Sequence, residues 1–329
     1  MQNLQNPVSQ PQQPLVSFIL TYYNLPVDML CACIKSILNL SLMAGEREIL
    51  LIDDGSDLSP LEHLKQFDND VIYVCQPNSG LSMARNKGIQ MATGTYLQFV
   101  DADDMLVRTP YEHCLDLARQ GKADVVMFDF SDSPQPHVAF ACEDPVSGTD
   151  LMRQRNLHGP ACGYLFRRAM LGELRFTPGI YHEDEEFTPQ LLLRAESVCV
   201  TNAKAYVYRK RPGSIITSTN VRQRLKRLND LLGVILRLNM LAGTLPTADR
   251  TALQRRVHQL TMDFIYKVIV ETRNRHYLDR KLNILRCNGL YPLPDKDYTA
   301  KYAWFRRLSS TQAGLSVLMR LLPLLNRER

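Results

Sequence analysis

A regular alternation of strand-like and helix-like segments over the first 130 residues constrains the fold most. Apolar runs at 15–20, 48–52, 71–75, 95–100 and 124–130 are separated by stretches with helical periodicity at 26–38, 60–67, 82–91 and 111–119. Strands that alternate with helices favour a mostly parallel sheet with helices on both faces. The chain is therefore predicted to contain an α/β domain of Rossmann-like type.

Four of these strands are followed directly by a polar motif. The motifs are Tyr23-Asn24, Asp53-Asp54, Asn78-Ser79-Gly80 and Asp101-Ala102-Asp103-Asp104. The carboxyl ends of parallel strands share one edge of a sheet, and ligands of open α/β sheets bind outside that edge. The four loops are therefore expected to converge on one site. If these motifs were unrelated solvated turns, there would be no reason for each of them to follow the end of a strand.

The last of these motifs places three carboxylates, Asp101, Asp103 and Asp104, within four residues. Neighbouring anions raise one another's pKa unless a cation lies among them. Mg²⁺ or Mn²⁺ suits carboxylates combined with substrate phosphates. The alternative is a solvated acidic turn after a buried strand, and the motif by itself does not separate the two.

Four other motifs each have a functional and a structural interpretation. Asp53-Asp54-Gly55-Ser56 could accept hydrogen bonds from a nucleotide base or ribose, or be a simple turn. Residues 78–88 place a glycine turn before a helix that carries Arg85. This helix start could bind an anion, or it could be an ordinary helix cap followed by a basic outer face. The run Glu183–Glu186 could supply a general base or form a solvated face. Residues 209–214 could close over phosphates or be a solvated basic loop.

The charge is distributed unevenly along the chain. Residues 221–329 hold 21 Lys/Arg and 8 Asp/Glu, a net charge of +13, whereas residues 1–220 hold 18 and 26, a net charge of −8. The basic part has helical periodicity and ends in an amphipathic stretch at 315–325. Two interpretations remain: a helical region that rests on an anionic membrane, or one that packs on the catalytic domain or on a second copy.

Other features indicate a reducing, cytoplasmic location. The eight cysteines are scattered without a CxxC pair, which is typical of free thiols. Residues 1–14 are rich in Gln, Asn and Pro and lack the basic and apolar segments of a signal peptide, so they are expected to be a disordered lead-in. No stretch has the roughly 18 uninterrupted apolar residues of a membrane span.

In this order the motifs resemble those of the family 2 glycosyltransferases, inverting enzymes with a GT-A fold. The resemblance runs from Pro14 to about Ser214. It rests on Val16–Ile19 through Tyr23-Asn24, Glu48-Ile49 through Ser56, Asn78-x-Gly80, Ala84-Arg85-Asn86-x-Gly88, Ala92-x-Gly94-x-Tyr96, Phe99-x-Asp101–Asp104, Glu183-Asp184-Glu185-x-Phe187 and Tyr208-x-x-Arg211-x-x-Ser214-Ile215. One departure is Thr21, where the family usually has proline; it removes no chemical group.

The resemblance implies roles for individual residues. Thr21, Tyr23 and Asp53 would hold the nucleotide base, and Asn78 and Arg85 would lie against the donor nucleotide. Asp101 and Asp103 would form the DXD motif, with Asp101 on the ribose and Asp103 on a divalent metal, Mn²⁺ or Mg²⁺, at the diphosphate. Asp184 would be the catalytic base that deprotonates the acceptor hydroxyl. Arg211 and Ser214 would belong to a mobile loop over the donor phosphates.

The resemblance therefore implies an enzyme that transfers a sugar, with inversion, from a nucleotide-diphosphate sugar, by family habit a UDP-sugar. The acceptor would be a glycan or a lipid-linked molecule in bacterial polysaccharide biosynthesis. We expect a GT-A catalytic domain at 15–220 and a basic helical region at 221–329. The protein is expected in the cytoplasm, with a peripheral contact to the inner face of the plasma membrane and no nucleic-acid partner.

Two other functional classes share parts of this pattern. A non-catalytic module that binds nucleotide sugars would share the donor motifs, but Asp184 would be dispensable. An aspartyl phosphotransferase also places Asp-x-Asp after a strand, but on the first strand of its domain, whereas Asp101 follows the fourth strand-like run here.

Overall fold

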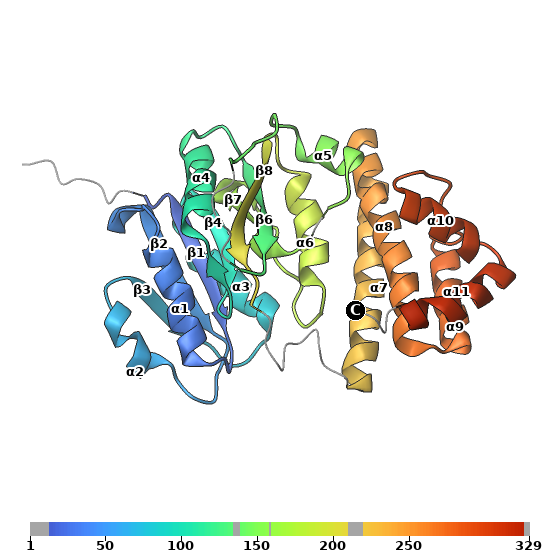
Figure 1. Ribbon diagram of the computed structural model, residues 1–329, viewed down its shortest axis with the longest axis horizontal. Coiled ribbons are helices and arrows are strands. Elements are labelled where there is room, and N and C mark those ends of the chain that lie inside the picture. Colours follow the sequence, from blue (N-terminus) through green and yellow to red (C-terminus); the bar gives the residue numbers. More distant parts are fainter. Residues whose placement is uncertain (1–12, 134–138, 158, 210–219, 326–329) are drawn as a thin grey trace, which may run out of the picture. The chain divides into compact units, whose positions relative to one another are not determined.

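The structure, a computed structural model of the chain, describes residues 13–133, 139–157, 159–209 and 220–325 (Figure 1). The chain forms two compact units. The first comprises Met1–Val146, Ala161–Gly179 and Glu196–Arg209, and the second comprises Ser147–Pro160, Ile180–Ala195 and Lys210–Arg329. Two segments that precede residue 220 in the sequence therefore belong to the unit of the C-terminal helices. The predicted functional boundary at residue 220 stays a prediction.

The described residues of the first unit form an eight-stranded sheet in the order β3-β2-β1-β4-β7-β6-β8-β5. The strands are β1 Val16–Tyr22, β2 Arg47–Asp53, β3 Val71–Cys75, β4 Tyr96–Asp101, β5 Met105–Leu106, β6 Val125–Ser131, β7 Tyr164–Arg167 and β8 Val198–Val207. Strands β3, β2, β1 and β4 are parallel, as is β6 with β8, whereas β7 is antiparallel to β4 and β6, and β5 to β8. The predicted α/β sheet is confirmed, and β7 and β5 make it a mixed one.

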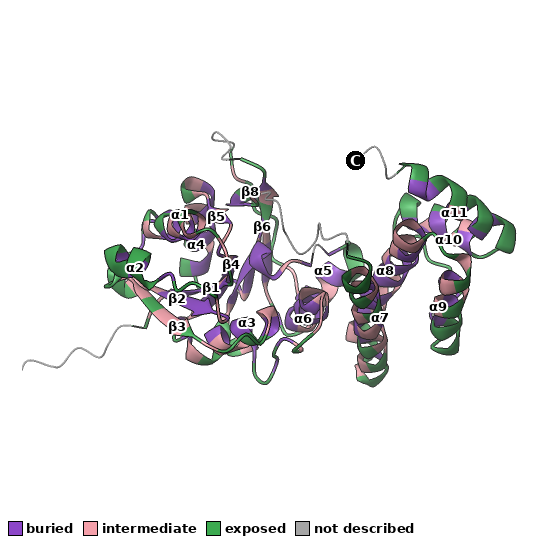
Figure 2. Cartoon of the chain, turned by 90° about the horizontal axis from the view of Figure 1, so that it is seen from below, coloured by how far each residue is buried: buried purple, intermediate pink, exposed green. Residues whose placement is uncertain are grey.

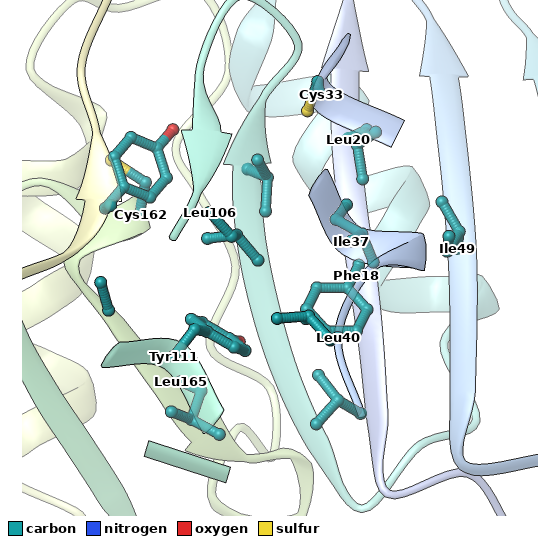
Figure 3. Close-up of a cluster of buried hydrophobic side chains, with 14 of the residues drawn as sticks. Phe18, Leu20, Cys33, Ile37, Leu40, Ile49, Leu106, Tyr111, Cys162 and Leu165 are labelled. Atoms are coloured by element: carbon teal, nitrogen blue, oxygen red, sulfur yellow. The ribbon is translucent and has the colours of Figure 1, made fainter. Parts of the chain in front are cut away.

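Helices flank this sheet. They are α1 Val27–Leu38, α2 Leu61–Leu64, α3 Leu81–Met91 and α4 Arg108–Arg119, with 3₁₀ turns at Ala44–Glu46, Lys65–Phe67, Ala161–Gly163 and Arg168–Met170. Residues next to each other on a strand face opposite sides of the sheet. On β1, Phe18 packs in the core cluster with Tyr111 of α4, drawn in Figure 3. Ile19 contacts α3 on the other side, where a Cβ at Gly88 would lie 2.2 Å from the Cγ2 atom of Ile19. Helix α3 approaches β1 this closely because residue 88 has no side chain.

The described part of the second unit is helical. Its helices are α5 Gly148–Gln154, α6 Glu183–Leu192, α7 Val221–Thr244, α8 Thr247–Thr272, α9 Arg275–Cys287, α10 Ala300–Ser309 and α11 Gln312–Leu325. The leucines predicted to share one face of α7, among them Leu228, Leu231 and Leu238, are buried in a core with Val257, Ile265 and other residues of α8 to α11. This unit therefore has a hydrophobic core of its own.

Two further findings concern membrane-spanning helices and the cysteines. No helix within the described ranges is both long and apolar enough to cross a membrane. All eight cysteines are free thiols, as predicted, and Cys33, Cys114, Cys162 and Cys199 are buried.

Candidate active site

The ends of four parallel strands bring the predicted polar motifs to one edge of the sheet. In the strand register Thr21 of β1 pairs with Asp101 of β4, and Asp53 of β2 pairs with Tyr22 of β1 and Cys75 of β3. The loop after β3, which contains Asn78, follows directly. The predicted convergence of the four loops is therefore confirmed within the first unit.

The acidic turn after β4 is held by the far end of β8. The hydroxyl of Tyr206, a fully buried residue, accepts a hydrogen bond from the backbone N–H of Asp101 at 3.1 Å and donates one to Oδ2 of Asp104 at 2.9 Å. Oδ1 of Asp104 accepts the backbone N–H of Arg209 at 2.8 Å. Burial, and next the charge of Asp101, raise the pKa of the Asp104 carboxyl to about 7. Asp104 thus belongs to the support of the turn rather than to its exposed surface.

The guanidinium of Arg209 completes this support. Its Nε donates to the carbonyl oxygen of Asp103, and its Nη2 donates to the carbonyl oxygens of Met29 at 2.9 Å and Asp104 at 3.3 Å. The side chain of Arg209, two residues beyond the end of β8, therefore connects this strand end to the acidic turn and to the first turn of α1. The sequence interpretation treated Arg209 as part of a basic loop and missed this structural role, which a basic residue at a strand end does not reveal by itself.

Arg85 lies beside Asp101, inside the unit. It is 4% exposed, so the alternative of a basic outer helix face is wrong for this residue. Its Nη2 lies 3.2 Å from Oδ1 of Asp101, and its guanidinium carbon lies 5.8 and 5.3 Å from the ring centroids of Phe99 and Phe176. The rings hold the cation against one oxygen of Asp101, whose side chain remains 32% exposed. Arg85 therefore orients this carboxylate and reduces the local negative charge.

The two aspartates after β2 have different roles. Both carboxylate oxygens of Asp53 accept hydrogen bonds, from the Tyr73 hydroxyl at 2.8 Å and the Ser56 N–H at 2.9 Å. Each oxygen has a second lone pair, so Asp53 can still accept a hydrogen bond from a ligand. Asp54 accepts the N–H groups of Ser79 and Gly80 at 2.9 and 2.7 Å and thereby shapes the loop that contains Asn78.

The other predicted donor-site residues, Thr21, Tyr23 and Asn78, differ in their exposure to solvent. Tyr23 is 48% exposed, and Asn78 is also exposed. Thr21 is half-buried between β2 and β4, and its carbonyl oxygen accepts the N–H of Ala102 at 3.3 Å. A Cβ at Gly55 would lie 2.7 Å from the backbone nitrogen of Asn78, so the loops after β2 and β3 are in contact.

The carboxylates of the turn fit a divalent cation that is shared with a phosphate ligand. Among the described residues, no group of three or more His, Cys, Asp or Glu could hold a metal without other ligands. Mg²⁺ needs only one or two protein carboxylates when phosphate oxygens and water complete its shell. Asp101 and Asp103 offer that number, since Asp104 is buried and already hydrogen-bonded.

The second acidic cluster forms the first turn of α6, in the second unit. Two of its four carboxylates are structural: Glu186 forms a two-point pair with Arg237 of α7, at 2.6 and 2.9 Å, and Glu185 pairs with Arg256 of α8. The solvated-face interpretation is therefore wrong for these two residues. Asp184 is half-buried at the second position of the helix, and its Oδ1 accepts the N–H of Glu185 at 2.8 Å.

His182 precedes this helix in an unusual backbone conformation. Its φ of 64° lies in the left-handed region, which is uncommon for a residue with a side chain. Burial, with a smaller contribution from Lys267, lowers the pKa of the imidazole to about 4, so His182 is neutral near pH 7. Arg211 and Ser214, which were expected in a loop over the donor phosphates, lie outside the described residues.

Comparison with known proteins identifies the domain. Residues 17–140 match the family described as Glycosyl transferase family 2. The chain is 31% identical over 219 residues to a Bacillus subtilis protein named Uncharacterized glycosyltransferase EpsJ, an alignment that covers 61% of this chain and 63% of EpsJ. The chain thus spans less than two thirds of the length of this relative.

The fold is shared with solved structures. With 18% identity and a TM-score of 0.67, the structure matches residues 1–349 of S. aureus TarS in complex with UDP-GlcNAc over 95% of this chain and 91% of that one. The mannosyltransferase PcManGT of Pyrobaculum calidifontis, in complex with GDP-Man and Mn²⁺, matches with 14% identity and a TM-score of 0.58 over 96% and 88%. The predicted GT-A fold with a C-terminal helical region is confirmed. Residues 17–140 thus match glycosyl transferase family 2, and the chain shares its fold with TarS and PcManGT.

Proposed function

We propose that the protein is an inverting glycosyltransferase that moves a sugar from a nucleotide-diphosphate sugar to a hydroxyl group in bacterial polysaccharide biosynthesis. One observation carries this proposal: in a domain that matches family 2, the ends of β1, β2 and β4 bring Thr21, Asp53 and Asp101 to one edge of the sheet, with Arg85 beside Asp101. A non-catalytic module that binds nucleotide sugars would have the same donor edge. What distinguishes an enzyme from such a module is a catalytic base, which we place in the second acidic cluster, residues 183–186.

The donor would bind across this edge. Thr21, Tyr23 and the second lone pairs of Asp53 would contact the nucleotide base, with Asn78 and Arg85 beside the nucleotide. Asp101 would bind the ribose and Asp103 a divalent cation, Mn²⁺ or Mg²⁺. When bound, that cation would act as a Lewis acid on the leaving diphosphate. Arg211 and Ser214 would cover the phosphates and exclude water, which otherwise hydrolyses the donor.

Asp184 would be the catalytic base. Its carboxylate takes the proton of the acceptor hydroxyl, and the acceptor oxygen bonds to the anomeric carbon as the bond to the diphosphate oxygen breaks. Attack on the face opposite the leaving group inverts the configuration of the sugar. This role for Asp184 follows the family resemblance of Glu183-Asp184-Glu185-x-Phe187, and the two following residues, Glu185 and Glu186, pair with arginines and have structural roles.

The donor and the acceptor are proposed as classes. TarS was solved with UDP-GlcNAc and PcManGT with GDP-Man and Mn²⁺, and we infer a UDP-sugar or another nucleotide sugar for this chain. The acceptor would be a glycan or a lipid-linked molecule, which the protein would meet as a cytoplasmic enzyme at the inner membrane surface. We propose no nucleic-acid partner.

The proposal is tested by thermal shift with UDP-Glc, UDP-Gal, UDP-GlcNAc and GDP-Man, each with Mn²⁺ and with EDTA. We expect at least one donor to raise the melting temperature in Mn²⁺, and EDTA or Asp103→Asn to weaken that shift. Absence of a shift with any donor would overturn the donor assignment. If Asp184→Asn retained transfer activity, the assignment of Asp184 as the catalytic base would be overturned. If the wild type bound donor but transferred no sugar, the alternative of a non-catalytic binding module would be favoured.

A further inference from the structure

Helix α11 is apolar on both of its faces. Leu315, Leu318 and Leu322 are at most 7% exposed and belong to the core of the second unit. On the outer side, Val317 and Leu321 are 43% and 49% exposed. A helix that is hydrophobic all round is normally covered on all sides. Within the described part of the chain, the outer side of α11 remains open to solvent.

The exposed apolar residues form one surface. Val317, Leu321, Leu324 and Leu325 recur at the three- and four-residue spacings that put side chains on one face of a helix. Leu324 and Leu325 are 59% and 65% exposed, and α10, which packs against α11, exposes 52% of Trp304. Figure 2 shows exposed residues along both helices. We call this set of five side chains, including Trp304, the C-terminal apolar face.

Positive charge accompanies this face. No Asp or Glu occurs between residues 300 and 325, while Arg307 of α10 and Arg320 of α11 are exposed. Arg320 follows Val317 by three residues and precedes Leu324 by four, so it lies within the apolar stripe. No carboxylate of the described residues forms an ion pair with Arg307 or Arg320, in contrast to Arg306, which pairs with Asp295.

We propose that the C-terminal apolar face docks on a membrane surface that contains anionic phospholipid. Helices that bind at a membrane interface lie in its plane, with apolar side chains below the headgroups and arginines at the phosphates. Tryptophan is enriched at that depth. A second copy of the chain fits less well, since a two-fold interface would bring the same uncompensated arginines together. The proposed sugar transfer does not depend on this contact, whereas the proposed location at the membrane surface does. Failure of the contact would therefore overturn that location and leave the transfer proposal untouched.

The test is co-sedimentation of the full chain with vesicles of phosphatidylcholine alone or with 30 mol% phosphatidylglycerol, without donor. We expect binding to the anionic vesicles and little to the neutral ones, and weaker binding at higher salt. Arg307→Gln with Arg320→Gln should weaken partitioning about 30-fold, at about 1 kcal/mol for each cation near the surface. Leu321→Ser with Leu324→Ser should abolish it.

Two controls make the outcome decisive. Ile72→Ser with Met240→Ser removes two exposed apolar side chains elsewhere, 48% and 73% exposed, and should leave binding unchanged. Unchanged melting temperatures show that each variant is folded. The proposal is overturned if the leucine variant binds like the wild type, or if neither vesicle binds. It is also overturned if light scattering shows a lipid-free dimer that the leucine substitutions dissociate.

Discussion

The Tyr206 hydroxyl and the Asp104 carboxylate form a buried hydrogen bond of 2.9 Å behind the acidic turn, and the same hydroxyl accepts the backbone N–H of Asp101. Strand β8 is therefore part of the candidate donor site although it supplies none of the predicted contacts. The position of the Asp101 and Asp103 carboxylates depends on this bond and on the Arg209 side chain. Residues far apart in the sequence thus determine the geometry of one motif.

Tyr206→Phe removes that hydroxyl and keeps the ring. The Asp101 N–H and one oxygen of Asp104 then lose a buried partner, so we expect a loss of about 1–3 kcal/mol of unfolding free energy. Donor affinity, measured by calorimetry with Mn²⁺, should also fall. Tyr302→Phe is the matched control, because the Tyr302 hydroxyl is bonded to the Pro294 carbonyl in the second unit. Equal donor affinity in the two variants would contradict the positioning role.

Arg85→Met removes the cation beside Asp101 but retains an apolar side chain between the rings of Phe99 and Phe176. We expect donor affinity to fall about tenfold or more, since a charged hydrogen-bond partner near the ligand is lost. Arg167→Met serves as the control: Arg167 also lies over a ring, 5.2 Å from that of Tyr96, and pairs with Asp124 at 3.3 Å. Titration with donor should show weaker binding for Arg85→Met and unchanged binding for Arg167→Met.

Gly88→Ala should destabilise the first unit by about 1–3 kcal/mol, because the new methyl group overlaps Ile19. Urea unfolding measures this loss. The double variant with Ile19→Ala should recover part of it, since the clashing Cγ2 is then absent. Gly45→Ala has no atom within 4 Å of its new methyl and should leave stability nearly unchanged. Equal effects at 45 and 88 would show that the close approach of α3 is not limiting.

Asp184→Asn and Glu186→Gln should have opposite consequences. Glu186→Gln weakens the two-point pair with Arg237, so the melting temperature should fall while transfer persists below it. Asp184→Asn should abolish transfer with little change in melting temperature and with donor binding retained. Both variants are compared by product formation and by thermal melting. If Glu186→Gln lost transfer activity at temperatures where it is still folded, Glu186 rather than Asp184 would be indicated as the catalytic carboxylate.

The stability should fall as the solution becomes acidic. Burial, and next the charge of Lys296, lower the pKa of His258 to about 4, while its Nδ1 lies 2.9 Å from the Tyr298 hydroxyl. Above pH 6.5 the imidazole is neutral in both states and contributes no pH dependence. Between about pH 6.5 and 4 only the unfolded state takes up the proton, so up to about 3 kcal/mol is lost. Urea unfolding at several pH values gives the unfolding free energy as a function of pH. Between pH 6.5 and 4 this free energy should fall less steeply for His258→Gln than for the wild type, and an equal fall would exclude this histidine as its cause.

The pattern of apolar runs was sufficient to predict the order of the longer strands and helices up to residue 131, but not the two-residue strand β5, and it predicted the meeting of four loops at one sheet edge. These properties follow from local periodicity and from the shared direction of parallel strands. Asp53 and Asp101 could be assigned to one edge for the same reason, whereas Arg85 was expected there from the family resemblance. The C-terminal helices were also predictable from their leucine spacing.

Only the tertiary structure decided which charged groups have which partners. Asp104 is buried because Tyr206 and Arg209, more than a hundred residues away, supply its hydrogen bonds. Glu185 and Glu186 are structural because α7 and α8 place arginines opposite them. Which face of α11 is covered likewise depends on the packing of α8 and α10. Such partners are set by contacts between distant segments, and local periodicity carries no information about them.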